Sequence, residues 1–148
     1  MTLEIHDYIQ PGRTAHLVGI GGVSMSPLAE VLHGAGVRIT GSDAHESGAV
    51  EHLRALGVPV TIGHLPESVE GADCVIRTAA VHDDNPEIIR ARQLGIPVFE
   101  RTQASRAISR PRQVGTSSRF WRLMSRKSGS RIWRATPVHF MRCRRRRA

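Results

Sequence analysis

The sequence predicts an α/β domain in which a five-stranded parallel sheet is covered by flanking helices. Two observations predict this fold. Short β-type runs alternate with helix-type segments along residues 14–99, and glycines or other turn residues separate them. A third observation limits the fold to part of the chain, because all 13 acidic residues lie within residues 1–103. We therefore predict a domain over residues 1–103 and a separate tail over residues 104–148.

Five short apolar runs are the predicted strands. They occupy residues 15–20, 37–41, 58–62, 73–78 and 96–99. Pro59 lies near the start of the third run, and since proline donates no ladder hydrogen bond, this strand is expected toward an edge of the sheet. Parallel neighbours need right-handed crossover connections, so the strands and their intervening helices predict a Rossmann-like unit.

Three helix-type segments connect these strands. The first carries apolar side chains at helical spacing, namely Leu28, Val31, Leu32 and Ala35. Ser26 and Pro27 have the residue types of an N-cap and a first helical position. The second helix is predicted over residues 47–56. The third is predicted over residues 85–94, because it opens with a capping Asn, a Pro suited to the first helical position and an acid near the positive end of the helix dipole.

The charge of the chain changes sign at residue 104. The formal net charge is +8, but residues 1–103 hold only 7 of the 21 basic residues and carry −6. Residues 104–148 hold 13 Arg, one Lys and no acid, and carry +14. We expect this tail to be out-of-frame or disordered, because a shifted frame of a GC-rich gene tends to give Arg, Ser, Trp and Cys without acids. A genuine polybasic segment that contacts nucleic acid or an anionic membrane through its charge is the alternative.

Composition argues against several other kinds of protein. Apolar runs in residues 1–103 are far shorter than the roughly 20 residues that span a bilayer, and the N-terminus lacks the basic and apolar regions of a secretory signal. Cys74 and Cys143 have neither metal-ligand spacing nor the density of a disulfide framework. We expect a cytoplasmic protein with no membrane span and no metal site.

A glycine-rich turn at residues 19–24 follows the first strand. Glycines let the backbone turn tightly and approach a ligand closely, and the next helix points free N–H groups and a partial positive charge at an anion. A diphosphate suits such a turn, although a tight turn without ligand has the same residues. Ser24 occupies the position where a dinucleotide fingerprint has its third glycine.

Other polar residues follow the second, third and fourth strands. Asp43 ends the second strand, where an acid commonly meets a bound nucleoside, although a turn or capping Asp looks the same. Small residues at 78–80 follow the fourth strand and could either border a ligand or pack tightly. His64 and Arg77 could contact a ligand, but we favour a surface histidine and an outward, solvated arginine.

No nucleophile with a base and no cluster of metal ligands is visible in the domain. The residues by themselves therefore predict a module that binds a nucleotide diphosphate without catalytic groups.

A set of motifs in residues 14–103 resembles a known family. These are HLVGIGGVSMSPLAEVL, ITGSD, IGH, EGADCVIRTAAV, NPE and RARQLGIPVFER, in this order. Together they are similar to the N-terminal domain of the Mur ligase family, in the branch of the UDP-N-acetylmuramate–L-alanine ligases and of the related ligases that reattach recycled tripeptide. The glycine loop and the GSD segment at this spacing are more specific than either motif alone. The sequence departs from the family at Ser24 and Pro27, where glycine is usual.

The resemblance implies that the domain holds the UDP part of UDP-N-acetylmuramate. Carried over by position, the diphosphate would be lined by Gly19, Gly21, Gly22, Val23 and Ser24. The uridine would meet Ser42 and Asp43, and the opposite wall would be formed by Thr78, Ala79 and Ala80.

The family's ATP loop, Gly-Thr-His-Gly-Lys-Thr-Thr, has no counterpart where the resemblance places it. Residues 114–119 read VGTSSR, without the His-Gly-Lys-Thr part of the loop, whose amides and lysine grip the ATP phosphates and whose hydroxyl helps to hold Mg²⁺. ATP and Mg²⁺ are cofactors of the full-length family, and we expect none in this fragment. We predict that the chain alone performs neither carboxylate activation nor amide formation. Two other functions stay open: an NAD(H)-binding module of an oxidoreductase, and a nucleic-acid-binding protein that acts through its tail.

Overall fold

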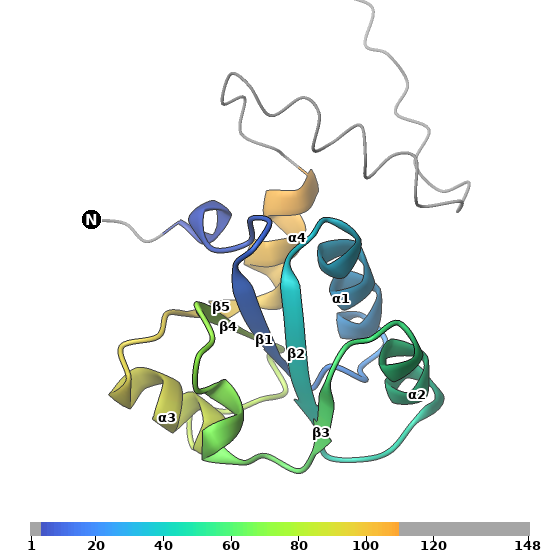
Figure 1. Ribbon diagram of the computed structural model, residues 1–148. Coiled ribbons are helices and arrows are strands. Elements are labelled where there is room, and N and C mark those ends of the chain that lie inside the picture. Colours follow the sequence, from blue (N-terminus) through green and yellow to red (C-terminus); the bar gives the residue numbers. More distant parts are fainter. Residues whose placement is uncertain (1–3, 110–148) are drawn as a thin grey trace, which may run out of the picture.

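The computed structural model describes residues 4–109, which form the predicted Rossmann-like α/β domain (Figure 1). The elements in chain order are η1 (Ile5–Asp7), β1 (Thr14–Val18), α1 (Met25–Gly34), β2 (Arg38–Asp43), α2 (Gly48–Ala55), β3 (Val60–Ile62), η2 (Pro66–Val69), β4 (Cys74–Arg77), α3 (Pro86–Gln93), β5 (Val98–Glu100) and α4 (Arg101–Ser109). All strand pairs are parallel, in the order β3-β2-β1-β4-β5. The predicted fold class is confirmed, and β3 lies at an edge as Pro59 indicated.

Each face of the sheet has its own apolar core. Alternate residues of a strand point to opposite faces, so Leu17 packs toward α1, α2 and α4, whereas its neighbour Val18 packs with side chains of η2 and α3. Figure 1 shows α3 and η2 side by side, apart from α1 and α2. The carboxyl ends of β1, β2 and β4 consequently open onto loops that lead to helices on different faces, which is the arrangement in which doubly wound sheets bind ligands.

Helix α1 begins two residues before the predicted start. Ser24 is the N-cap, while Ser26 and Pro27 lie inside the first turn. The amides of Met25 and Ser26 donate to the Gly22 carbonyl, at 3.0 and 2.9 Å, so the glycine turn itself starts the helix. Pro27 is tolerated there because N–H groups of a first turn need no partner within the helix.

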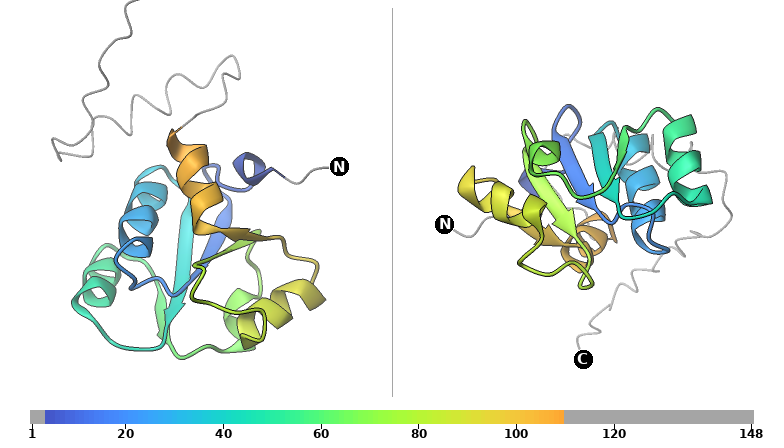
Figure 2. Two further views of the ribbon diagram at one scale, coloured as in Figure 1. Left: turned by 180° about the vertical axis from the view of Figure 1, so that it is seen from behind. Right: turned by 90° about the horizontal axis from the view of Figure 1, so that it is seen from below.

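The predicted boundary between residues 103 and 104 falls inside α4. Ala104 and Ala107 are buried in the same core as Leu28 and Leu32, and Figure 2 shows α4 between α1 and η1. The change of charge at residue 104 therefore lies within the folded domain, because α4 continues past this residue and buries small apolar side chains. The rest of the predicted tail, residues 110–148, lies outside the described residues.

Ser24 and Ser47 both occupy N-cap positions, but only one of them caps its helix with its side chain. The Oγ of Ser47 accepts a hydrogen bond from the N–H of Val50, whereas Ser24 makes no side-chain cap of α1. We expect Ser47→Ala to lower the free energy of unfolding by about 0.5–2 kcal/mol, the usual value of a lost cap. The matched change Ser24→Ala should have little effect in urea unfolding curves of the free protein. Equal losses for both variants would contradict this difference.

In the described part of the chain, no helix is both long and apolar enough to cross a membrane.

Candidate functional site

The glycine turn between β1 and α1 is tied to the end of β2. The N–H groups of Gly19 and Ile20 both donate to the Ser42 carbonyl, at 2.8 and 3.0 Å. Gly19 has φ +79°, a left-handed conformation that glycine adopts without steric cost. The N–H of Gly22 also donates, to the Gly19 carbonyl at 3.1 Å, so backbone contacts fix the turn.

Gly21 is glycine because another part of the fold fills the space beside it. Its N–H donates to Oδ2 of Asp43 at 2.8 Å. A Cβ at this position would lie 2.9 Å from that oxygen and 2.9 Å from Cγ2 of Val50. The close approach brings the carboxylate of β2 against the glycine turn, and it leaves the Gly21 N–H already bonded.

The amides of Val23 and Ser24 are the ones that the turn leaves available. Within the described residues, neither N–H donates to a protein acceptor. Val23 is 97% exposed. Both N–H groups immediately precede α1, whose dipole adds partial positive charge at the same place. The geometry therefore offers two neighbouring donors for an anion.

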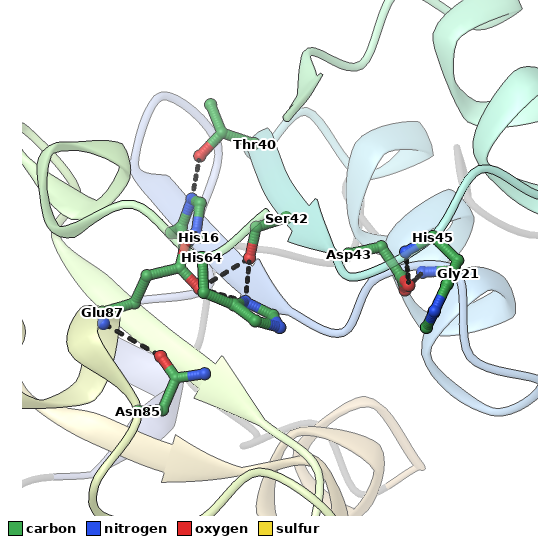
Figure 3. A network of polar contacts seen from close by, with 9 residues as sticks. All are labelled: His16, Gly21, Thr40, Ser42, Asp43, His45, His64, Asn85 and Glu87. Atoms are coloured by element: carbon green, nitrogen blue, oxygen red, sulfur yellow. Dashed lines mark hydrogen bonds and ion pairs between the residues drawn. The ribbon is translucent and has the colours of Figure 1, made fainter. Parts of the chain in front are cut away.

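Ser42 and Asp43 point to opposite sides of the sheet, as Figure 3 shows. Asp43 faces the glycine turn, and its Oδ1 accepts from the N–H of His45 at 3.2 Å. Ser42 faces α3, is fully buried and donates its hydroxyl proton to Oε2 of Glu87 at 2.7 Å. The two residues that were predicted to act together thus belong to different clusters.

The loop after β4 lies beside the glycine turn. Thr78 is half-buried, Ala79 and Ala80 are exposed, and a turn joins the Thr78 carbonyl to the Val81 N–H at 3.1 Å. A Cβ on Gly19 would lie 3.8 Å from the Val81 side chain. Residues 78–80 are therefore brought near the first loop, at the same edge of the sheet.

Arg77 is not the outward, solvated residue that the sequence suggested. Its side chain is 19% exposed and donates to the Val81 carbonyl at 3.1 Å and to Asp83 at 2.6 Å. Hydrogen bonds from Arg92 and from Arg77 lower the pKa of Asp83. Arg77 consequently fixes the loop after β4 instead of reaching a ligand from the end of the strand.

A buried polar cluster lies on the α3 side of the sheet, apart from the contact between Asp43 and Gly21 (Figure 3). Glu87 is at its centre and fully buried. Its Oε1 lies 3.2 Å from Nε2 of His16, and its Oε2 lies 2.9 Å from Nδ1 of His64. His16 in turn contacts the hydroxyl of Thr40 at 2.9 Å. The cluster joins β1, β2, the segment after β3 and the first turn of α3.

Glu87 is held as a carboxylate despite its burial. Burial acts to raise its pKa, but hydrogen bonds from His16, Ser42 and His64 outweigh it and place the pKa below its usual range. The position near the N-terminus of α3, where Asn85 caps the helix by accepting from the Glu87 N–H at 2.9 Å, also favours negative charge.

Sequence reasoning missed this cluster. Glu87 was predicted only as an acid at a helix start, His16 was not singled out, and His64 was expected on the surface. A signal was present: polar side chains at His16, Thr40 and Ser42 interrupt apolar strands at positions that alternation assigns to one face. Nothing in the sequence indicated that Glu87, 71 residues after His16, would meet them.

No group of three or more His, Cys, Asp or Glu in the described residues has a geometry that could hold a metal ion. Cys74 is buried, and burial raises the pKa of its thiol to about 12, so it behaves as an apolar side chain.

Fold and site together define a class: a Rossmann-like domain whose first loop presents backbone N–H groups at the carboxyl edge of a parallel sheet. The chain belongs to the Mur ligase family, whose catalytic domain matches residues 14–113. The resemblance stated from the motifs is thereby confirmed.

Two relatives and one solved structure that the chain resembles are alanine ligases by name. A UDP-N-acetylmuramate–L-alanine ligase of Legionella pneumophila (strain Corby) is 58% identical over 86 residues, which are 58% of this chain and 18% of the relative. One of Hyphomonas neptunium is 49% identical over 100 residues, 68% of this chain and 21% of the relative. The solved UDP-N-acetylmuramate–alanine ligase of Thermotoga maritima matches with a TM-score of 0.63 at 38% identity, over 65% of this chain and 22% of that chain. The chain therefore spans 18% to 22% of the length of these relatives.

Proposed function

We propose that this domain binds the UDP part of UDP-N-acetylmuramate, as the UDP-sugar-binding domain of a UDP-N-acetylmuramate–L-alanine ligase. The observation that carries the proposal is the pair of N–H groups at Val23 and Ser24, which have no acceptor among the described residues and lie next to the carboxyl ends of β1 and β2. A diphosphate accepts hydrogen bonds from such donors and gains from the α1 dipole. The names of the relatives, which contain UDP-N-acetylmuramate, support this choice of ligand.

Within this proposal the predicted site residues have different roles. Val23 and Ser24 supply N–H donors to the diphosphate, while Gly19, Gly21 and Gly22 shape the turn. Asp43 orders the turn through Gly21 and borders the nucleoside. Ser42 contributes through its carbonyl and its bond to Glu87, because its side chain is buried. The opposite wall is formed by Thr78, Ala79 and Ala80.

The direct test is calorimetry of the full chain with UDP-N-acetylmuramate and, separately, with NADH. We expect the UDP-sugar to bind and NADH to give no signal. Binding of NADH without the UDP-sugar would assign the domain to dinucleotide chemistry and refute the proposal.

Replacing Asp43 with alanine should weaken binding of UDP-N-acetylmuramate by about 1–3 kcal/mol, the scale of hydrogen bonds to a charged group. The variant removes the acceptor of the Gly21 and His45 N–H groups, so the turn loses its order. The control is Glu46→Ala, which removes one exposed acidic charge of the same region. Removing a negative charge alone should strengthen the binding of a diphosphate. A loss of affinity in Asp43→Ala that is absent in Glu46→Ala therefore reports the lost hydrogen bonds. Unchanged affinity would place the ligand elsewhere.

The proposal concerns binding and not ligation. A UDP-sugar ligand is consistent with the cytoplasmic location that we expect for the chain.

A further inference from the structure

The loop between β4 and α3, residues 78–84, lies at the point where the strand order of the sheet reverses. In the order β3-β2-β1-β4-β5 the chain moves outward from β1 on one side and from β4 on the other, and doubly wound sheets bind ligands at such a point. The glycine turn follows β1, and the loop follows its neighbour β4. The two approach each other at Val81, whose side chain would lie 3.8 Å from a Cβ on Gly19. The loop therefore limits the space that a ligand on the glycine turn has on the β4 side.

One nitrogen atom of Arg77 fixes the shape of this loop. Its Nη1 donates to the Val81 carbonyl at 3.1 Å and to Oδ1 of Asp83 at 2.6 Å. The same Oδ1 accepts from Nη2 of Arg92 at 2.8 Å, so the loop is bonded to the end of β4 and to α3. Hydrogen bonds between ionised groups are stronger than neutral ones. These contacts hold residues 78–83 between strand and helix.

The bond to the Val81 carbonyl is the most important of these contacts. Asp83 and Arg92 are 62% and 54% exposed, and exposed ion pairs contribute little because water competes for both charges. Arg77 is mostly buried, and Val81 packs against the apolar core between the sheet and α3. A carbonyl in such surroundings needs a donor. Among the described residues, Arg77 is the side chain that donates to it.

We propose that Arg77 is a positioning residue for the sugar end of the UDP-sugar: it holds the loop after β4 in the shape that contacts this part of the ligand. The inference rests on the proposed function. A diphosphate at the N–H groups of Val23 and Ser24 joins two parts of the ligand, and the nucleoside lies toward β2. The sugar therefore extends toward β4 and residues 78–81. A loop that is already ordered loses little conformational entropy when it contacts a ligand, so Arg77 strengthens binding of the sugar without touching it.

The effect on the loop is tested without any ligand. Arg77→Met keeps an unbranched chain and removes every donor, so the ¹⁵N order parameters of residues 78–81 in the full chain should fall. The control is Arg90→Met, which removes the same charge from α3, where Arg90 pairs with the exposed Glu70 at 2.7 Å. It should leave the loop unchanged. Order parameters that stay the same in Arg77→Met would overturn the inference.

The effect on the ligand is tested by calorimetry of the full chain with UDP-N-acetylmuramate and with UDP. We expect Arg77→Met to weaken binding of the UDP-sugar about tenfold, the scale of one lost hydrogen bond, and to leave binding of UDP unchanged. Arg90→Met should change neither affinity. A structural defect in the whole domain, or the loss of a positive charge near the diphosphate, weakens both ligands alike. Equal losses for the two ligands, or no loss for either, would therefore refute the role of Arg77.

Arg77→Lys is the conservative variant. Both loop contacts come from a single nitrogen, and an ammonium group has three N–H donors, so lysine can make them again. We expect it to restore the order of the loop and most of the affinity for the UDP-sugar. If Arg77→Met does not fold, Arg77→Gln takes its place, because its amide is polar but too short to reach the Val81 carbonyl. A lysine variant that behaves like the methionine or glutamine variant would contradict the proposed contacts.

The outcomes separate this inference from the proposed function. An unmodified chain that binds neither UDP nor UDP-N-acetylmuramate refutes the proposed function, and this inference with it. An unmodified chain that binds both with equal affinity leaves the proposed function in place and overturns only the inference, because the sugar then gains nothing from the loop.

Discussion

Glu87→Ala should lower the free energy of unfolding by about 3–5 kcal/mol, the range for removing one partner of a buried charged cluster. Three donors point at this carboxylate, from His16, Ser42 and His64, and two of them are on buried side chains. Truncation leaves these donors without an acceptor and opens a cavity between β1, β2 and α3. Chemical unfolding monitored by far-UV circular dichroism measures the loss.

The control for this change is Glu70→Ala. Glu70 is an exposed acid that pairs with Arg90 at 2.7 Å, and exposed pairs contribute about 0–1 kcal/mol. A loss at Glu87 no larger than that at Glu70 would show that the buried cluster does not stabilise the fold.

The same carboxylate makes stability depend on pH in a defined direction. Its pKa in the folded protein lies below the ordinary value of 4.5, so the unfolded chain binds the proton first as pH falls. The stabilisation is complete above pH 4.5 and is lost as pH falls through the lower, folded pKa. Free energies of unfolding measured from about pH 6 to pH 3 should fall less steeply for Glu87→Gln than for the unmodified chain. Equal slopes would contradict the lowered pKa.

Gly41→Ala should lower the free energy of unfolding by about 3 kcal/mol, near the upper end of the usual range for overpacking a core. A Cβ at this position would lie 2.5 Å from Cδ1 of Ile20, 2.8 Å from its Cβ and 2.9 Å from the Leu17 carbonyl oxygen. Two of these contacts are with atoms close to the backbone, so rotating a side chain cannot relieve them. The strands β1 and β2 must move apart.

Gly48→Ala is the matched control for this substitution. Gly48 is the first residue of α2, and a Cβ there meets nothing within 4 Å. Because alanine favours helix over glycine, this variant should be neutral or more stable by up to about 1 kcal/mol. Thermal unfolding of the two variants side by side tests the contrast, and similar destabilisation of both would refute the packing argument.

Sequence reasoning succeeded where the cause of a structure is local. The spacing of apolar residues predicted the strands and three helices, and Asn85 was predicted as the cap that the structure shows at the start of α3. The glycine turn was located from its composition. Sequence reasoning failed at the start of α1. The hydrogen bonds of the Gly22 carbonyl, and not the pair Ser26–Pro27, decide where that helix begins.

The sequence by itself therefore determined the fold class, the order of its elements and the family, since periodicity and motifs record which face of each element is buried. Only the tertiary structure decided which polar groups meet. Strand order brings His16, Ser42 and Glu87 together across long stretches of chain and turns Asp43 toward Gly21. It also leaves the N–H groups of Val23 and Ser24 without an acceptor in the part of the chain that the structure describes. These pairings depend on crossovers between distant segments, which no local pattern of residues records.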